Sequence, residues 1–250
     1  MNNILFLIIS PFIAMSVKRM KDFSFLKKII CDKIEDENIG FAELFSGVHL
    51  IINILVIILI LQKKDFTVLI LLSIFADLFR GFSMLYSNDK KSFKIALNRL
   101  CKILKYGFVI LLFLPVYKFL NGTFLICDIS ENFMIKSVPF FFISFLFASI
   151  LKLDFFEEFD KDIIHVSKIS SLFLILGRQF EIVVILLLLS LFYVKFSIFA
   201  FVISFLLLFV IYFIISKFNF SKDVLNFNFL YIISVFLGFL NIIYLIFLKS

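Results

Sequence analysis

Eight apolar runs separated by short polar loops constrain this chain more than any other feature of its sequence. A helix needs roughly 20 apolar residues to cross the hydrocarbon core of a bilayer, and segments such as 50–61, 182–192 and 196–215 contain almost nothing else. Hydrophobic residues make up 63% of the chain, so most of it must face lipid or other helices. We therefore expect an all-α, polytopic transmembrane helical bundle that forms a single integral membrane domain over residues 1–250.

The apolar runs predict about eight membrane-spanning helices. They are expected at about residues 2–17, 42–62, 66–86, 106–120, 134–151, 170–194, 196–216 and 227–248. Pro11, Pro115 and Pro139 fall inside these runs. Prolines are tolerated within transmembrane helices when neighbouring groups satisfy the freed carbonyl, so we expect a kink rather than a boundary at each of them.

Positive charge alternates from one loop to the next and sets the predicted orientation. Seventeen of the 25 Lys and Arg residues lie in four alternate loops, at 18–41, 87–105, 152–169 and 217–226. The positive-inside rule places these loops in the cytoplasm and both termini outside. The chain is thus predicted to be a multi-pass protein of the inner (plasma) membrane.

The three broad cytoplasmic loops, at about 18–41, 87–105 and 152–169, are long enough to form a docking surface for soluble partners. The net charge of +7 is explained by basic residues beside the spans, where they fix topology and meet anionic lipid head groups. Membrane lipid is therefore an expected partner, and nucleic acid is not.

Two acid–base couples interrupt the apolar spans, Asp77 with Arg80 and Arg178 with Glu181. Both have i, i+3 spacing, which places the two side chains on one helix face, where they can neutralise each other. They are interpreted either as self-contained ion pairs that orient a helix or as the border of a hydrated proton or ion path. Glu43, near the start of its span, is a further candidate for that path.

An acidic segment follows the span that ends near residue 151. Its carboxylates crowd into nine positions on the predicted cytoplasmic side: Asp154, Glu157, Glu158, Asp160 and Asp162. Such crowding can support proton exchange, although it is also typical of a solvated acidic loop. His49 and His165 are each interpreted as hydrogen-bonded structural residues or, as the alternative, as proton relays.

Motifs of autonomous enzymes are absent from the sequence. There is no P-loop, dinucleotide-binding glycine motif, nucleophile elbow or aspartate-rich prenyl-diphosphate signature. The cysteines at 31, 101 and 127 lack the spacing of metal ligands, so no metal site is expected. We expect no catalytic centre and no cofactor on this chain.

Several landmarks in chain order resemble one membrane protein family. An apolar stretch, a proline and a basic run occupy 7–21, and Asn98-Arg99-Leu100 follows the third span. Ser137-Val-Pro139 precedes an apolar helix that ends in Lys152-Leu-Asp-Phe155 and enters the acidic segment, and Ile175 to Val184 begins the sixth span. The chain is thus similar to the eight-helix membrane subunit of respiratory complex I that joins the quinone-site region to the membrane arm. It is more similar to the counterparts of that subunit in formate hydrogenlyase and the energy-converting, membrane-bound NiFe hydrogenases.

The resemblance implies a non-catalytic subunit of a multi-subunit redox complex. Such a subunit anchors soluble electron-transfer subunits and couples electron transport to proton or sodium translocation. NiFe or iron–sulfur centres are then expected on the soluble cytoplasmic partners, with antiporter-like subunits in the membrane. By the same resemblance Arg99 would lie on the docking face, and the five acidic-segment carboxylates would link redox change to protonation.

Two other functions fit the residues themselves. A small secondary transporter or channel would use the Asp/Arg and Arg/Glu couples as a site near the membrane midplane. An intramembrane enzyme would use Glu157, Glu158 and His165 as acid and base, although such groups usually come from several helices.

Overall fold

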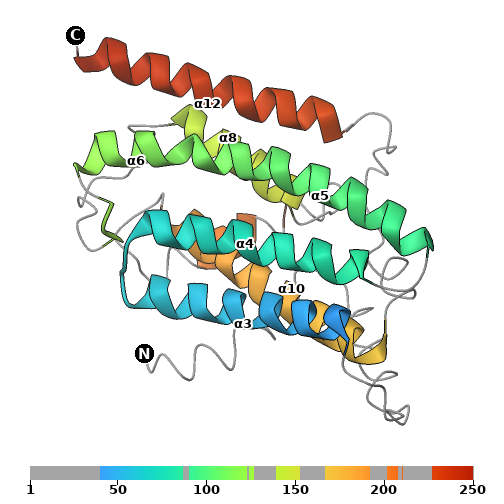
Figure 1. Ribbon diagram of the computed structural model, residues 1–250. Helices are drawn as coiled ribbons and strands as arrows, with labels where there is room; N and C mark the ends of the chain where they lie inside the picture. Colours follow the sequence, from blue (N-terminus) through green and yellow to red (C-terminus); the bar gives the residue numbers. More distant parts are fainter. Residues whose placement is uncertain are drawn as a thin grey trace. The chain divides into compact units, whose positions relative to one another are not determined.

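The computed structural model describes residues 40–86, 90–122, 124–126, 139–152, 167–191, 202–207, 210 and 227–249. Within these residues the chain is all-α (Figure 1). Its main helices are α3 (Phe41–Leu61), α4 (Phe66–Leu85), α5 (Lys90–Leu111), α6 (Phe113–Asn121), α8 (Pro139–Lys152), α10 (Lys168–Ser190) and α12 (Phe227–Lys249).

Five apolar stretches of helix are long enough to cross a membrane. They are Phe41–Leu61, Phe66–Leu85, Ala96–Phe119, Lys168–Ser190 and Asn228–Phe247. By helix length and hydropathy the chain is a multi-pass membrane protein, which confirms the predicted fold class. The total of eight helices stays a prediction, because the span at 2–17 and most of the span at 196–216 lie outside the described residues.

Four predicted spans agree with α3, α4, α10 and α12 to within a few residues at each end. The segment 87–105 differs from the prediction of a connecting loop, because α5 already begins at Lys90. Its lysines obscure an amphipathic pattern in which the buried residues Ala96, Ile103 and Tyr106 recur every three to seven positions. A helix therefore extends through most of this segment.

Two of the prolines mark helix interruptions. α5 ends at Leu111, the residue whose carbonyl loses its helical partner because Pro115 has no N–H. Leu112 keeps helical angles, with φ −60° and ψ −21°, so α6 resumes at once, as expected of a kink. Pro139 is instead the first residue of α8, where the missing N–H costs no helical hydrogen bond. Residues 134–138, the part of the predicted span before Pro139, lie outside the described residues, so the kink predicted at Pro139 stays a prediction.

Contacts divide the chain into two compact units. The first contains α3, α4 from Leu71, α5 up to Ile103 and α10 up to Val184. The second contains the first turn of α4, α5 from Leu104, α6, α8, the end of α10 and α12. The predicted single membrane domain over residues 1–250 stays a prediction.

Small and polar residues bring the helices of the first unit close together. Ser83 Oγ, near the end of α4, donates a hydrogen bond to the Ala42 carbonyl at the start of α3, at 2.9 Å. A Cβ atom on Gly81 of α4 would lie 2.5 Å from Leu100 Cδ2 of α5, so a larger residue at this position would force the Leu100 side chain to move. Such residues are typical of helix interfaces in membranes, where close backbone approach supplies the attraction.

Backbone bonds in the second unit join the α3–α4 turn to the segment after α6. Phe66 N–H donates to the Phe124 carbonyl at 2.8 Å, and Ile126 N–H donates to the Lys64 carbonyl at 3.4 Å. The Phe66 ring also stacks on Tyr117 with 4.3 Å between centroids. Both turns were predicted to lie on the outer side of the membrane, so this contact agrees with the predicted alternation of the loops.

A second contact, at the start of α12, joins two segments that are predicted to lie on the same side of the membrane. Lys105 Nζ in α5 donates to Asn228 Oδ1 at 2.6 Å, and both residues adjoin loops predicted to be cytoplasmic. The alternation of loops therefore agrees with the contacts, whereas the assignment of either side to the cytoplasm stays a prediction.

Candidate functional site: a buried charged cluster on three helices

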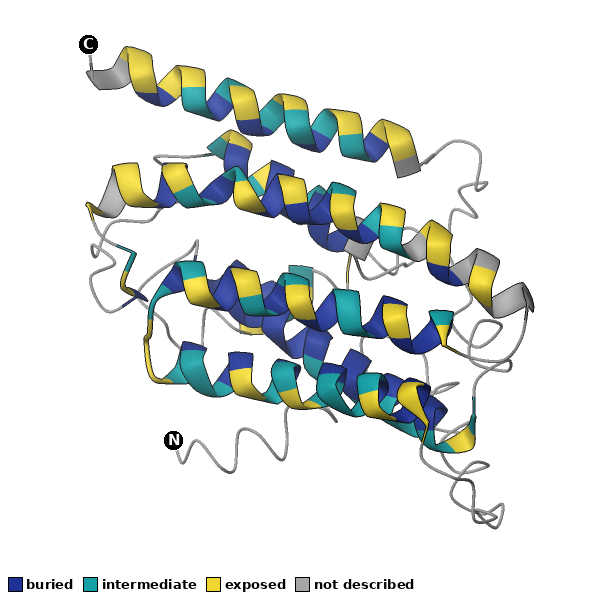
Figure 2. Cartoon of the chain, in the orientation of Figure 1, coloured by how far each residue is buried: buried dark blue, intermediate teal, exposed yellow. Residues whose placement is uncertain are grey.

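The inward face of α3 is polar, although the helix as a whole is one of the most apolar segments of the chain. Its buried polar side chains recur every three or four residues: Glu43, Ser46, His49 and Asn53. The opposite face exposes large apolar side chains such as Phe41 and Ile51 (Figure 2). Apolar residues thus face outward, as lipid requires, and the polar stripe faces α4 and α10.

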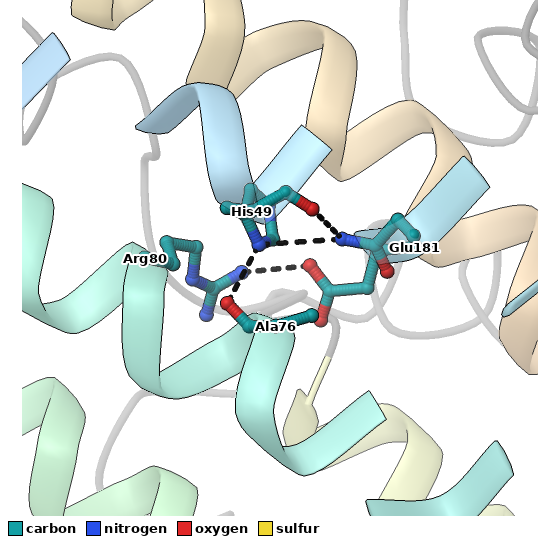
Figure 3. Close-up of polar contacts among 5 residues, drawn as sticks. His49, Ala76, Arg80 and Glu181 are labelled. Carbon is teal, nitrogen blue, oxygen red and sulfur yellow. Dashed lines mark hydrogen bonds and ion pairs between the residues drawn. The ribbon is translucent and has the colours of Figure 1, made fainter. Parts of the chain in front are cut away.

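An ion pair joins α4 to α10 inside the first unit. Arg80 Nη1 donates to Glu181 Oε2 at 2.8 Å, and the two side chains are 5% and 1% exposed (Figure 3). The sequence leaves each couple either as a self-contained ion pair or as the border of an ion path. The structure adds a pairing between the two couples, because the long side chains of Arg80 and Glu181 reach across the interface between α4 and α10.

The other two in-span charges lie next to this pair. Asp77 precedes Arg80 by three residues and Arg178 precedes Glu181 by three, so each shares a helix face with a member of the pair. Asp77 is 1% exposed and Arg178 is 2% exposed. The four side chains carry two positive and two negative formal charges, so the cluster is neutral as a whole. Because the charges cancel, burying the cluster within membrane-spanning helices costs less free energy than burying a lone charge.

His49 of α3 contacts both α4 and α10 and so relates the levels of the three helices. Its Nδ1 lies 2.8 Å from the Ala76 carbonyl of α4, and because a carbonyl only accepts, Nδ1 carries the proton (Figure 3). On the side of α10, a Cβ atom on Gly177 would lie 2.4 Å from His49 Cδ2. Ala76 and Gly177 therefore lie at the same depth, and so do the residues that follow them, Asp77 and Arg178.

Asn53 secures the His49 layer one helical turn further along α3. Its side-chain amide donates to the His49 carbonyl at 2.9 Å, and the side chain is 1% exposed. His49 is thus a hydrogen-bonded residue, as one of its two interpretations required. The sequence did not predict that His49 lies beside the Arg80–Glu181 pair.

Glu43 lies at the other end of the polar stripe and joins the start of α3 to the start of α10. Its carboxylate accepts hydrogen bonds from the hydroxyls of Ser167 and Ser170, the latter at 3.3 Å, and from Gly40 N–H at 2.8 Å. Ser167 Oγ also accepts from Ser170 N–H at 3.2 Å, which caps α10. A carboxylate between two helix amino ends is stabilised by both dipoles.

The remaining predicted site residues are less defined. The acidic segment, with Asp154, Glu157, Glu158, Asp160 and Asp162, lies outside the described residues, and Arg99 is placed only as a backbone position in α5. Sequence reasoning missed Ser46, Asn53 and Gly177. The three-to-four-residue spacing of polar groups along α3 is the signal that could have found the first two.

The cluster places hydrogen-bonding and ionisable groups in the interior of membrane-spanning helices. Glu181, Asp77 and His49 can each take up or release a proton, and the arginines hold the negative charge that remains. Within the described helices no three His, Cys, Asp or Glu side chains converge as ligands for a metal ion.

The fold and this cluster define an all-α, polytopic membrane protein with a charged interior. Comparison of the sequence with models of known protein families and with curated proteins finds no match.

Proposed function

We propose that the chain is a non-catalytic, integral membrane subunit of a multi-subunit redox complex of the membrane-bound hydrogenase or NADH dehydrogenase-like kind. In this role it anchors soluble electron-transfer subunits on the cytoplasmic side. It also couples their redox chemistry to the movement of protons or sodium ions.

The observation that carries the coupling role is the buried Arg80–Glu181 pair, with Asp77 and Arg178 beside it. Charged residues are expensive within a membrane and usually mark the path of an ion or proton. A helix-orienting role alone would be met by small or hydroxylated residues at far lower cost. The redox role is supported by the order of landmarks that resembles the complex I and hydrogenase subunits.

Purification of the tagged chain from its host in mild detergent tests the assembly. We expect soluble proteins with NiFe or iron–sulfur centres and antiporter-like membrane subunits to copurify in fixed proportion. A matched Asp77→Asn variant should still assemble but should lower redox-driven ion movement in membrane vesicles. Recovery of the chain alone and in pure form would argue against the redox complex.

A small secondary transporter or channel is the second candidate. It is favoured by the interruption between α5 and α6 and by the short helix α8, because transporters often build their sites from discontinuous helices. The test is ion or solute flux into liposomes that contain only the purified chain. Flux that disappears in Asp77→Asn would favour this function over the first.

A further inference from the structure

Asn53, the last residue of the buried polar stripe on α3, carries an acceptor that lacks a donor. Its side chain is 1% exposed, and its Nδ2 donates to the His49 carbonyl at 2.9 Å. Because a carbonyl oxygen only accepts, the amide atom beside it must be the nitrogen, and this fixes the position of Oδ1. Oδ1 has no hydrogen-bond donor among the described residues. Buried polar atoms nearly always have a partner, so this oxygen calls for a donor that another state of the protein supplies.

The register between α3 and α10 places Asn53 level with Glu181. Three contacts define this register: Glu43 with Ser170, Gly47 with Phe173 and His49 with Gly177. The residue numbers rise together on the two helices, so α3 and α10 run parallel and advance in step. Asn53 follows His49 by one helical turn, and Glu181 follows Gly177 by one helical turn. The two side chains therefore lie at the same depth, on the helix faces that meet.

Glu181 meets the charges of α4 with one of its carboxylate oxygens. Its Oε2 accepts from Arg80 Nη1 at 2.8 Å, and the Glu181 side chain is 1% exposed (Figure 3). The other charged or titratable groups that the described helices bring to this cluster are His49 on α3, Asp77 on α4 and Arg178 on α10. Asp77 shares a helix face with Arg80, so a carboxylate stays near this arginine if Glu181 loses its charge.

The composition of the cluster favours a proton over a metal cation. Arg80 and Arg178 already balance the two carboxylates, so a sodium ion would meet no net negative charge at this depth. A carboxyl group holds a proton by itself and then becomes a hydrogen-bond donor. Asn53 Oδ1 is an acceptor at the level where Glu181 would provide this donor.

We propose that Asn53 is a positioning residue that holds Glu181 in its protonated, neutral form, and that the ion carried by the cluster is therefore a proton. The step adds H⁺ to one carboxylate oxygen of Glu181, and the new O–H donates to Asn53 Oδ1. This hydrogen bond replaces the ion pair with Arg80, which keeps its own proton and has Asp77 to oppose its charge. The inference rests on the proposed function, because it names the ion that the coupling subunit moves.

Infrared difference spectroscopy between neutral and acidic pH, on the purified full-length chain in lipid nanodiscs, tests the proposal. A protonated carboxyl group has a C=O band separate from the amide bands, and this band lies at lower wavenumber when the O–H donates a hydrogen bond. The wild type should gain such a band on acidification, and Glu181→Gln should remove it. Asn53→Leu should shift the band to higher wavenumber. Ser46→Ala, which changes a buried hydroxyl on the same face of α3, should leave its position unchanged.

Asn53→Ala removes the same acceptor without adding bulk and gives the same comparison if the leucine variant does not fold. The proposal is wrong if the folded wild type shows no band that depends on Glu181. It is also wrong if this band has the same position in the Asn53 variants as in the wild type. Copurification of redox subunits is measured separately, so a failure of this inference can be told apart from a failure of the proposed function.

Discussion

Replacing Glu181 by leucine should destabilise the first unit by about 3 kcal/mol, because Arg80 then keeps a charge that is buried without its partner. The pair is close, at 2.8 Å, and almost fully shielded, with 5% and 1% of the two side chains exposed. Breaking a buried ion pair costs about 3–5 kcal/mol in soluble proteins, and a lone charge at the centre of a membrane helix costs about 2.5–3.5 kcal/mol. Asp77 lies one turn from Arg80 and partly compensates its charge, so we expect the lower end of these ranges.

The same reasoning predicts that the effects of substituting Arg80 and Glu181 on the free energy of unfolding are far from additive. Arg80→Met should cost about as much as Glu181→Leu, about 3 kcal/mol, since it removes the partner of the buried carboxylate on the other helix, and Arg178, one turn away, compensates only part of its charge. The double variant removes both charges, and replacing a buried pair by apolar residues is often neutral, so it should cost less than about 1 kcal/mol. Unfolding by sodium dodecyl sulfate in mixed micelles, followed by circular dichroism, measures the three free energies.

Additive losses would refute this reasoning. If the double variant were destabilised by about 6 kcal/mol, the sum of the two single effects, the side chains would not depend on each other, and the pair would not exist in the membrane. The substitution Gln179→Leu provides a matched control, because it alters a buried polar side chain in the same turn of α10 without changing the charge.

Two further predictions concern packing and orientation. Gly177→Ala should destabilise the first unit by about 1–3 kcal/mol, because its Cβ would overlap the His49 ring. Gly47→Ala, with 3.8 Å to the nearest atom, should be neutral or stabilising. Equal decreases in the melting temperatures of the two variants would contradict the close approach of Gly177 to His49. In a variant that carries Cys31→Ser and Cys127→Ser, the exposed thiol of Cys101 should react with a membrane-impermeant maleimide only after the cells are permeabilised. Labelling of this variant in intact cells would reverse the predicted orientation.

The membrane-spanning helices were largely predictable because their signal is local. An uninterrupted apolar stretch of sufficient length admits few structures other than a spanning helix, so α3, α4, α10 and α12 follow directly from composition. α5 did not, because Lys90, Lys91 and Lys94 make its first turns look like a polar loop. Its helix is recognised only from the spacing of the apolar residues between the charges.

The candidate site was predictable in its members but not in its contacts. Burial of Asp77, Arg80, Arg178 and Glu181 follows from their position within apolar spans. Which charge meets which depends on the register between α4 and α10, and a single sequence carries no information about register between distant helices. The same limit hid Gly177, whose importance appears only once His49 lies against it.

The pairing of α8 with α12 has a consequence for the order in which the protein is made. Ser144 Oγ of α8 donates to the Ser234 carbonyl at 2.6 Å, and Phe141 finds its acceptor 100 residues further along the chain. At a ribosomal rate of about 5–20 residues per second, α8 enters the bilayer roughly 5–20 s before this acceptor is synthesised. During that interval Phe141 N–H and Ser144 Oγ lack the acceptors that α12 later supplies, so the packing of α8 is completed only after α12 has been synthesised.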